Sequence, residues 1–430
     1  MELDSQAIEL NDRIKGCSSA LFELLSDKGK AIFFPKLGIL AQSAEAKGKR
    51  INATIGIAVE DDGSPMRLNS IASKISLGPN DVFSYAPSFG KPELRAKWKE
   101  MLFRKNPSLV GKIISSPVVT NALTHGLSVS GYLFVNKGDE VIIPDPYWEN
   151  YGLIFGNGFG GKIKTFDCFK KDSFNIGGLK KVLSKGKDKK VLLLNFPNNP
   201  SGYTPLIDEV SQIVQAIKEA AVSGKNIVVL IDDAYFGLFY KDSVYKESIF
   251  SQLADLHERV LAVKLDAATK EDYVWGLRVG FMTFAMKGVD VKALEALEAK
   301  AGGAVRGEIS NASHLSQSLV LNAFSSPTYD SEKLEKYNLL KSRFVEVERV
   351  LSSHKEYRKC FVPLPFNSGY FMCIKLKKGL DTEKVRKKLL EKYDTGVINM
   401  SGLLRIAFSA VKKDVIPELF DNVYKACLEE

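Results

Sequence analysis

The sequence predicts an α/β fold with two parts. One is a large domain built on a mostly parallel sheet with helices on both faces, and the other is a smaller α+β domain. With 430 residues the chain exceeds the size at which a single core stops growing, so two domains are expected. From about Val118 to Phe284, short apolar runs alternate with helical stretches. Such runs are typical of a parallel sheet that is covered on both faces.

The apolar runs of the large domain are expected to form its strands. They are Val118–Val119, Val141–Pro144, Val191–Asn195, Ile227–Asp232, Val260–Val263 and Phe281–Phe284. In sheets of this kind, ligands bind at the carboxyl ends of the strands. Residues that directly follow these runs are therefore the first candidates for a functional site.

The C-terminal part has a different pattern. From Ser331 to Ser353, apolar residues recur at helical spacing with charges between them, which predicts a long amphipathic helix. Gly369–Ile374 and Leu404–Phe408 are expected to be strands, with a helix from Thr382 between them. We therefore expect an N-terminal segment over 1–60 that packs with the small domain, a large domain over 61–330, and a small α+β domain over 331–430.

Composition is that of an ordinary globular protein, with 45% hydrophobic and 26% charged residues. The acidic start of the chain does not resemble a secretory signal, and the apolar runs are too short to span a bilayer. The five cysteines are scattered without CxxC spacing, so no disulfide framework or metal site is expected and a cytoplasmic location is favoured. The net charge of +9 comes from lysine patches without interleaved aromatic residues, which favours a solvated surface over a nucleic-acid groove.

Polar residues stand where several predicted strands end. Asn199 follows one strand, Asp232 ends the next and Lys270 follows another. A lysine bound to pyridoxal phosphate through a Schiff base requires an acid beneath the pyridine nitrogen, donors for the ring oxygen and a cation for the phosphate. Asp232 would supply the acid and Arg278 the cation, while Tyr235 and Asn199 would supply the donors. Each residue alone is equally typical of a turn, a cap or a solvated loop, so it is the combination that favours a cofactor site.

A helix is expected to begin directly after the strand Val118–Val119, in the run Thr120–Gly126. Free backbone N–H groups at a helix N-terminus bind phosphate. This position indicates the amides of Ala122 and Leu123 and the hydroxyl of Thr124 as phosphate contacts. An ordinary capped helix is the alternative.

Two further side chains fit a flat ring and an amino acid. Trp148, at the end of another predicted strand, is a candidate for stacking on the ring, although aromatic residues are more often part of a core. Arg405 lies in an otherwise apolar strand, and its guanidinium would hold a substrate carboxylate through two parallel hydrogen bonds, with Asn199 as a second candidate for the same carboxylate. The alternative is an arginine on a solvated strand face.

Together these residues resemble the fold type I, class I aminotransferases, most closely the aspartate aminotransferase branch. The resemblance covers most of the chain, from about Asn52 to Arg405. Asn199–Gly202 and Asp232–Tyr235 match the family's motifs closely, and the step from Lys270 to Arg278 has the family's spacing. Jointly these motifs are a strong signal, although each one is weak by itself.

The resemblance adds three expectations about the site. Asn52–Gly56 is similar to the family's substrate-covering segment, which implies a substrate contact at Gly56. Tyr85 begins a stretch whose tyrosine reaches the phosphate of the neighbouring subunit. The segment around Trp148 is similar to the one that carries the ring-stacking tryptophan, which favours Trp148 over Tyr147.

The resemblance implies a homodimeric, pyridoxal-phosphate-dependent aminotransferase that transfers an amino group between an L-amino acid and a 2-oxo acid. Arg306 lies in a run similar to one whose arginine enters the partner's site and holds a dicarboxylate side chain, which implies aspartate or glutamate as donor. A surface arginine is an equally good interpretation of Arg306. Aromatic or neutral donors, a lyase or decarboxylase of the same fold, and a cofactor-binding regulator or nucleic-acid binder remain the alternatives.

The sequence departs from the family at the phosphate site. Ala267 stands where the family usually has Ser or Thr, and Ala122 and Leu123 replace a Ser-Gly pair. Two hydroxyl donors are therefore missing, which predicts weaker cofactor binding by about 1–3 kcal/mol per charge-assisted hydrogen bond. Asp266 places a carboxylate close to this site in sequence, and the pattern assigns it no role.

Overall fold

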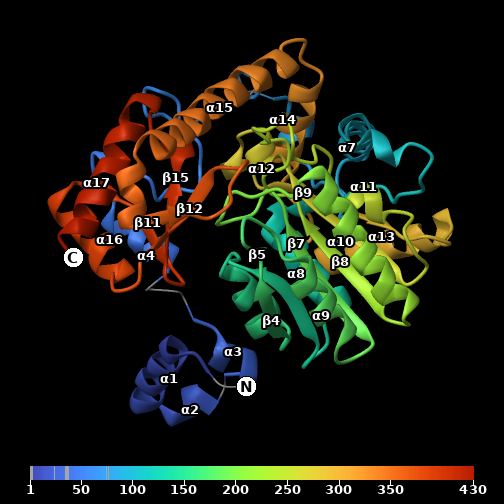
Figure 1. The fold of residues 1–430 in the computed structure, drawn as a ribbon. Helices are drawn as coiled ribbons and strands as arrows, with labels where there is room; N and C mark the ends of the chain where they lie inside the picture. Colours follow the sequence, from blue (N-terminus) through green and yellow to red (C-terminus); the bar gives the residue numbers. More distant parts are fainter. Residues whose placement is uncertain (1–2, 24, 34–37, 74, 76) are drawn as a thin grey trace.

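The large domain of this computed structural model is built on a seven-stranded sheet (Figure 1). The structure describes residues 3–23, 25–33, 38–73, 75 and 77–430. The strand order is β2 (Val118–Asn121), β10 (Val279–Ala285), β9 (Val260–Ala267), β8 (Asn226–Asp232), β7 (Lys189–Asn195), β3 (Glu140–Asp145) and β4 (Lys162–Asp167). All neighbours pair in parallel except β10, which is antiparallel to both β2 and β9. The predicted mostly parallel sheet and each of its predicted strands are confirmed.

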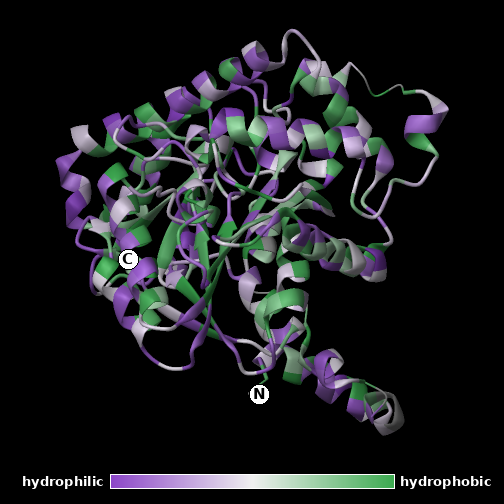
Figure 2. Ribbon diagram, turned by 90° about the vertical axis from the view of Figure 1, so that its right-hand side faces the viewer, coloured by the Kyte–Doolittle hydropathy of each residue, from purple (hydrophilic) through white to green (hydrophobic). Residues whose placement is uncertain are grey.

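The strands form where apolar residues run without interruption. β7 and β8 are buried along almost their whole length, and Figure 2 shows green hydrophobic strands in the interior with purple hydrophilic stretches on the outer helices. The outermost strand, β4, is different because Lys162, Lys164 and Asp167 interrupt its apolar pattern. This strand was not predicted, since its sequence lacks the continuous apolar run that marks the others.

Helices cover both faces of the sheet, as successive residues of β10 illustrate. A Cβ atom on Gly280 would lie 2.6 Å from the carbonyl carbon of Ala122, where α8 (Ala122–Phe134) begins. The next residue, Phe281, points to the opposite face and stacks on Trp98 of α7 (Pro92–Lys105), with ring centroids 3.9 Å apart. This alternation follows from the pleat of a strand.

The remaining elements of the large domain are short or lie on the periphery. They are α5 (Asn69–Ala72), α6 (Pro79–Val82), β5 (Phe169–Lys170), β6 (Ser173–Phe174), α9 (Ile176–Ser184), α10 (Ile207–Val222), α11 (Phe250–Leu253), α12 (Ala268–Glu271), α13 (Val291–Ile309) and α14 (His314–Phe324).

The small domain is an antiparallel sheet with helices against it. Its strand order is β11 (Phe361–Pro363), β12 (Phe371–Leu376), β15 (Leu403–Ala407) and β14 (Ile398–Met400), and its helices are α16 (Thr382–Lys392) and α17 (Ile416–Leu428). The helix α15 (Tyr329–Ser353) leads from the large domain into this unit, at the position where the sequence predicted a long amphipathic helix. Within the described residues, no helix has both the length and the apolar character needed to cross a bilayer.

The N-terminal segment contacts both domains. Its elements are α1 (Ser5–Cys17), α2 (Ser19–Glu23), α3 (Asp27–Ala31), α4 (Ile39–Glu45) and β1 (Ile51–Asn52). β1 pairs in parallel with β13 (Thr395–Gly396), and Gln42 of α4 exchanges two hydrogen bonds with the backbone of Asn399, so this part joins the small domain. The carbonyl of Ala31 in α3 instead accepts a hydrogen bond from Asn157 of the large domain. The boundary at residue 60 stays a prediction.

Candidate active site

The carboxyl ends of the parallel strands meet at one edge of the large sheet. Asn195 of β7 is in register with Asp232 of β8. β10 runs in the opposite direction, so its start lies at this same edge, where Gly280 pairs with Ala267 of β9. Lys270 follows in α12, directly after β9. The topology therefore gathers residues that are far apart in the sequence.

Lys270 lies between an aromatic ring and two charged groups. Its ammonium nitrogen is 4.3 Å from the ring centroid of Tyr235. Desolvation lowers the pKa of Lys270 to about 8; the Asp232 carboxylate acts against this shift and the Arg278 guanidinium adds to it. Near neutral pH a useful fraction of this amine is uncharged, which a nucleophile or a general base requires.

Asp232 is a buried carboxylate held by three donors. Its Oδ2 accepts a hydrogen bond from the hydroxyl of Tyr151 at 2.6 Å, and its Oδ1 accepts from Asn195 Nδ2 and from the backbone N–H of Ala234, each at 3.1 Å. Burial raises the pKa of Asp232, while the Tyr151 hydroxyl and the Lys270 ammonium favour its charged form. Such a fixed carboxylate can keep a neighbouring base protonated.

Arg405 is a buried guanidinium without a carboxylate partner among the described residues. Its Nη1 donates to Asn199 Oδ1 at 3.3 Å and its Nη2 to the carbonyl of Thr54 at 3.0 Å, while Nε has no partner. Its central carbon lies 4.3 Å from the ring centroid of Phe371. A buried guanidinium without an ion-pair partner is energetically costly, so the space beside Arg405 is suited to an incoming anion.

The start of α8 forms the other end of the site. Ala122 adopts a left-handed φ of 61°, and with it the helix begins directly after β2. A surface hollow beside it is lined by Thr124, Ser128 and Arg278, among other residues. Helix N–H groups, hydroxyls and an arginine form a suitable environment for a phosphate.

Comparison with known proteins identifies the family. Residues 61–423 match the family of class I and II aminotransferases. The chain belongs to this family. It is a pyridoxal-phosphate-dependent aminotransferase that acts on amino acids and 2-oxo acids, which confirms the predicted resemblance, cofactor and reaction type.

The aminotransferase is similar to proteins from diverse organisms. A probable aspartate/prephenate aminotransferase of Rickettsia felis is 24% identical over 416 residues, which cover 91% of this chain and 93% of the relative. A crystal structure of an aminotransferase from Anaerococcus prevotii has a TM-score of 0.84 at 25% identity and covers 94% of this chain and 99% of its own. The cytoplasmic aspartate aminotransferase of Saccharomyces cerevisiae shares the fold, with a TM-score of 0.75 at 19% identity over 96% of this chain and all of its own.

The donor set of the aminotransferase fits pyridoxal phosphate. Lys270 offers an amine of lowered pKa and Asp232 a fixed carboxylate that would suit a ring nitrogen, while the start of α8 with Arg278 would suit a phosphate. Burial raises the pKa of Tyr235, so its hydroxyl stays protonated and is able to donate to a ring oxygen. Trp148 is half-buried near these groups, and its ring meets that of Tyr151 edge-on with centroids 5.5 Å apart.

The structure also accounts for the charge of Asp266. Its Oδ2 accepts a hydrogen bond from Trp98 Nε1 at 3.1 Å and lies 3.3 Å from the ammonium of Lys264. Phe281, which also stacks on Trp98, is the register partner of Asp266, so this carboxylate lies on the α7 face of the sheet. Ala267 is the register partner of Gly280, and therefore shares the α8 face with the phosphate site. Asp266 thus does not oppose an anion there.

Three further predicted site residues lie at the surface. Gly56 and Arg306 are exposed, and the side chain of Tyr85 is 90% exposed. Of these, Gly56 is beside the Arg405 end of the site, because a Cβ atom added to it would lie 4.0 Å from the ring of Phe371. Arg306 is near the end of α13, two residues before Glu308, whose carboxylate lies 3.0 Å from Nε2 of His125 in α8. The end of α13 is therefore close to the start of α8.

Two residues that support the site were not predicted as part of it. Tyr151 and Asn195 both hold the carboxylate of Asp232. Asn195 also accepts a hydrogen bond from the backbone N–H of Asn199 at 2.7 Å, so it fixes two predicted site residues at once. Asn195 could have been found from the sequence, because it is a polar residue at the end of a buried strand. Tyr151 offered none beyond its place three residues after Trp148.

Proposed function

We propose that the aminotransferase uses the predicted site residues in their expected roles and that its preferred amino donor is aspartate or glutamate. The observation that carries the proposal is Arg405, a buried guanidinium that forms no ion pair with any described residue, is influenced by Glu149 only from a longer distance, and hydrogen-bonds Asn199. A substrate α-carboxylate would supply the missing charge through two hydrogen bonds.

The residues that would hold the cofactor divide by the part they contact. Asp232 would hold a proton on the ring nitrogen, and Tyr235 and Asn199 would donate to the ring oxygen. Trp148 would cover one face of the ring. The phosphate would be held by the amides of Ala122 and Leu123, by Thr124 and by Arg278, with Tyr85 of the other subunit. When bound, pyridoxal phosphate supplies an electron sink that weakens the bonds to the substrate's α-carbon.

The protein's own part in the reaction is orientation and proton movement. Arg405 would fix the substrate by its α-carboxylate, and Gly56 would cover it. The Nζ atom of Lys270, released by the incoming amino acid, would accept the α-proton as a general base and return a proton as a general acid. The lowered pKa of Lys270 supports this role, because a base is most effective when its pKa is near the working pH.

The preference for a dicarboxylate rests on Arg306 and on the relatives. Aspartate appears in the names of the Rickettsia felis relative and of a Sulfolobus acidocaldarius relative that is 28% identical over 201 residues. Arg306 would enter the site of a second subunit and bind the side-chain carboxylate of the donor. The large exposure of Tyr85 supports the same homodimer with shared sites. A cytoplasmic location is part of this proposal.

The visible spectrum of the cofactor-loaded protein tests the proposal. Addition of L-aspartate or L-glutamate should remove the yellow colour, and 2-oxoglutarate or oxaloacetate should restore it. Arg306→Gln should weaken this response to dicarboxylates while leaving neutral donors unaffected. A colour change with aromatic or neutral donors alone would contradict the dicarboxylate preference.

Replacement of Lys270 tests the site itself. Lys270→Ala should remove turnover while the folded structure is retained. Borohydride reduction of the loaded wild-type protein followed by peptide mapping should find the cofactor on Lys270. Near-normal activity of the Lys270→Ala variant would refute the assignment.

A further inference from the structure

The turn that carries Lys270 is short and cannot be stable by itself. α12 spans Ala268–Glu271, a single helical turn, and isolated turns of this length do not form in water. Two backbone hydrogen bonds close it, from Asp272 N–H to the carbonyl of Ala268 at 2.8 Å and from Val274 N–H to that of Thr269 at 3.0 Å. Contacts with the rest of the protein must therefore fix its orientation.

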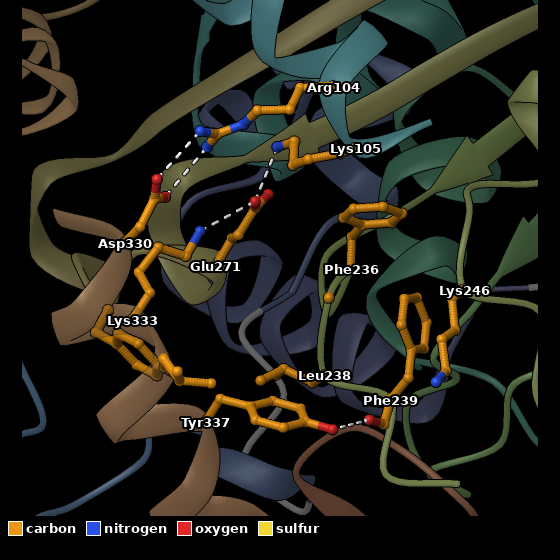
Figure 3. A pocket seen from close by; sticks show the side chains of 13 residues that line it. Arg104, Lys105, Phe236, Leu238, Phe239, Lys246, Glu271, Asp330, Lys333 and Tyr337 are labelled. Atoms are coloured by element: carbon orange, nitrogen blue, oxygen red, sulfur yellow. Dashed lines mark hydrogen bonds and ion pairs between the residues drawn. The ribbon is translucent and has the colours of Figure 1, made fainter. Parts of the chain in front are cut away.

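Two carboxylates directly after Lys270 provide such contacts. Glu271 Oε1 lies 2.8 Å from the ammonium of Lys105, at the end of α7, and 3.1 Å from that of Lys333 in α15. Asp272 Oδ1 lies 3.0 Å from the same Lys333 ammonium and accepts a hydrogen bond from the hydroxyl of Tyr329 at 2.5 Å. Figure 3 shows Lys105 and Lys333 converging on Glu271 from opposite sides. We call these four charged residues the lysine clamp.

The two carboxylates of the clamp are buried, and its two lysines are half-buried. The side chains of Glu271 and Asp272 are 6% and 0% exposed. Burial raises the pKa of Asp272, and the Lys333 ammonium acts against that shift. Burial acts to raise the pKa of Glu271, but the two ammonium groups outweigh it and hold that pKa at about 2. Burial likewise acts to lower the pKa of Lys333, and the carboxylates of Asp272 and Glu271 raise it well above its ordinary value. Buried ion pairs of this kind are rigid, because each charge would be left uncompensated if its partner moved.

The backbone beyond the clamp needs this support. Tyr273, directly after Asp272, has a left-handed φ of 58°. A bulky residue in this region is an outlier that persists where the surroundings hold it in place. Its neighbour Asp272, fixed by Lys333 and Tyr329, supplies one such constraint.

The clamp also links α12 to the helix that leads into the small domain. Lys333 lies in the second turn of α15, and further along this helix Arg343 donates hydrogen bonds to the carbonyl of Ser409 and to Asp61. A cavity of about 410 Å³ is lined by the start of α15 and by the segment 236–239, and the Tyr337 hydroxyl donates to the carbonyl of Phe239 at 2.6 Å on one side of it. The ion pairs of Lys333 connect α15 with α12 on another side (Figure 3).

We propose that Lys105 and Lys333, acting through Glu271 and Asp272, are positioning residues that hold Lys270 in the active site and couple it to α15, which leads into the small domain. The proposal rests on the proposed role of Lys270 as the cofactor-bound lysine. Its clamp residues do not touch the substrate or the cofactor, and act through the orientation of α12.

Lys333→Met tests the clamp, with Asp330→Asn as the matched control. Asp330 lies in the same helix at the rim of the same cavity and forms an exposed pair with Arg104, 3.2 Å apart, that does not touch α12. Two quantities should be measured: kcat and KM of the loaded enzyme, and the pH midpoint for acylation of Lys270 in the full chain before cofactor is added.

In Lys333→Met we expect kcat to fall about tenfold while KM changes less than about twofold, because substrate binding by Arg405 is unaffected. The pH midpoint for acylation of Lys270 should rise by about one pH unit, from about 8 toward the ordinary lysine value. The reason is that a loosened turn admits water to the amine, whereas the neighbouring charges of Asp232 and Arg278 are unchanged. Lys333→Arg, which keeps the charge, should recover part of kcat. Asp330→Asn should leave both quantities unchanged.

Asp272→Asn provides the same test if Lys333→Met does not fold, because the amide keeps an oxygen for the Tyr329 hydroxyl. Two results together would overturn the clamp but leave the proposed site intact. Borohydride reduction would find the cofactor on Lys270, and the folded variants would keep the wild-type kcat and the wild-type pH midpoint for acylation of Lys270. Cofactor on another lysine would overturn the proposed site, and the clamp with it.

Discussion

Desolvation and Arg278 lower the pKa of Lys270, and this has a measurable consequence for the proposed uptake of the cofactor. The unprotonated amine attacks an aldehyde, whereas the ammonium form does not. Because the pKa of Lys270 is lowered to about 8, the reactive form becomes abundant at lower pH than for an ordinary lysine. Cofactor-free protein should bind pyridoxal phosphate faster as the pH rises, with a midpoint near 8 in a stopped-flow absorbance experiment. A midpoint close to the ordinary lysine value would contradict the predicted environment of this amine.

The charge of Arg405, unlike that of Lys270, is permanent, so its proposed role depends on the planar geometry of its guanidinium. Arg405→Lys keeps a positive charge but loses the planar pair of donors. We expect kcat/KM for aspartate to fall about 10²-fold, since charge-assisted hydrogen bonds contribute about 1.5–3 kcal/mol each. Steady-state kinetics would measure this, and the affinity for pyridoxal phosphate without substrate should stay unchanged as the internal control. A loss of cofactor affinity equal to the loss of kcat/KM would place Arg405 in a different role.

At the scale of elements, the contact between β10 and α8 sets the shape of the phosphate end. Gly280→Ala would bring a Cβ atom to 2.6 Å from the Ala122 carbonyl carbon, so the first turn of α8 would have to move. We expect the dissociation constant of pyridoxal phosphate to increase at least about tenfold, since helix N–H groups bind phosphate through their position. Equilibrium titration of the visible absorbance would measure it.

Gly276→Ala is the control for this substitution. Gly276 lies earlier in the same segment, and a Cβ atom added to it would have open space around it, with no atom of the described residues beyond its chain neighbours within 4 Å. The cofactor affinity of this variant should match that of the wild-type protein. Equal losses in both variants would show that glycine flexibility, and not the close approach to α8, is what matters.

The elements also show which parts of the fold a sequence can predict. The central strands are covered on both faces, so their apolar character is continuous and their positions were predicted correctly. β4 was missed because its lysines suit an outermost position. The expected site residues Asn199, Asp232 and Lys270 could be singled out because they end or closely follow buried strands, and the structure brings them to one edge of the sheet. The hydrogen bond from Tyr151 to Asp232 joins residues 81 positions apart, and no local pattern encodes such a contact.

At the scale of the whole molecule, the proposed homodimer predicts that two variants with impaired activity toward aspartate restore that activity when mixed. If Lys270 acts in one subunit and Arg306 of the partner completes the same site, a hybrid dimer of Lys270→Ala and Arg306→Gln chains contains one intact site. After joint refolding of equal amounts, about a quarter of the wild-type activity toward aspartate is expected, because half of the dimers are hybrids with one working site. Each variant refolded separately provides the control. No recovery would argue against shared sites.

The two edge strands of the large sheet, β2 and β4, differ in what lies beside them, and this difference is relevant to self-association of the folding chain. At β2 the outer side is occupied, because the N–H of Val119 donates to the carbonyl of Phe89 at 2.9 Å. At β4 the strand order stops, and an open row of backbone groups would be a template for another copy of the chain. Lys162 and Lys164 place positive charge along this row, with Lys164 2.9 Å from Glu140. Because charged side chains on an outermost strand disfavour its pairing with another chain, we expect the lysines that obscured β4 in the sequence to protect the folding chain from aggregation.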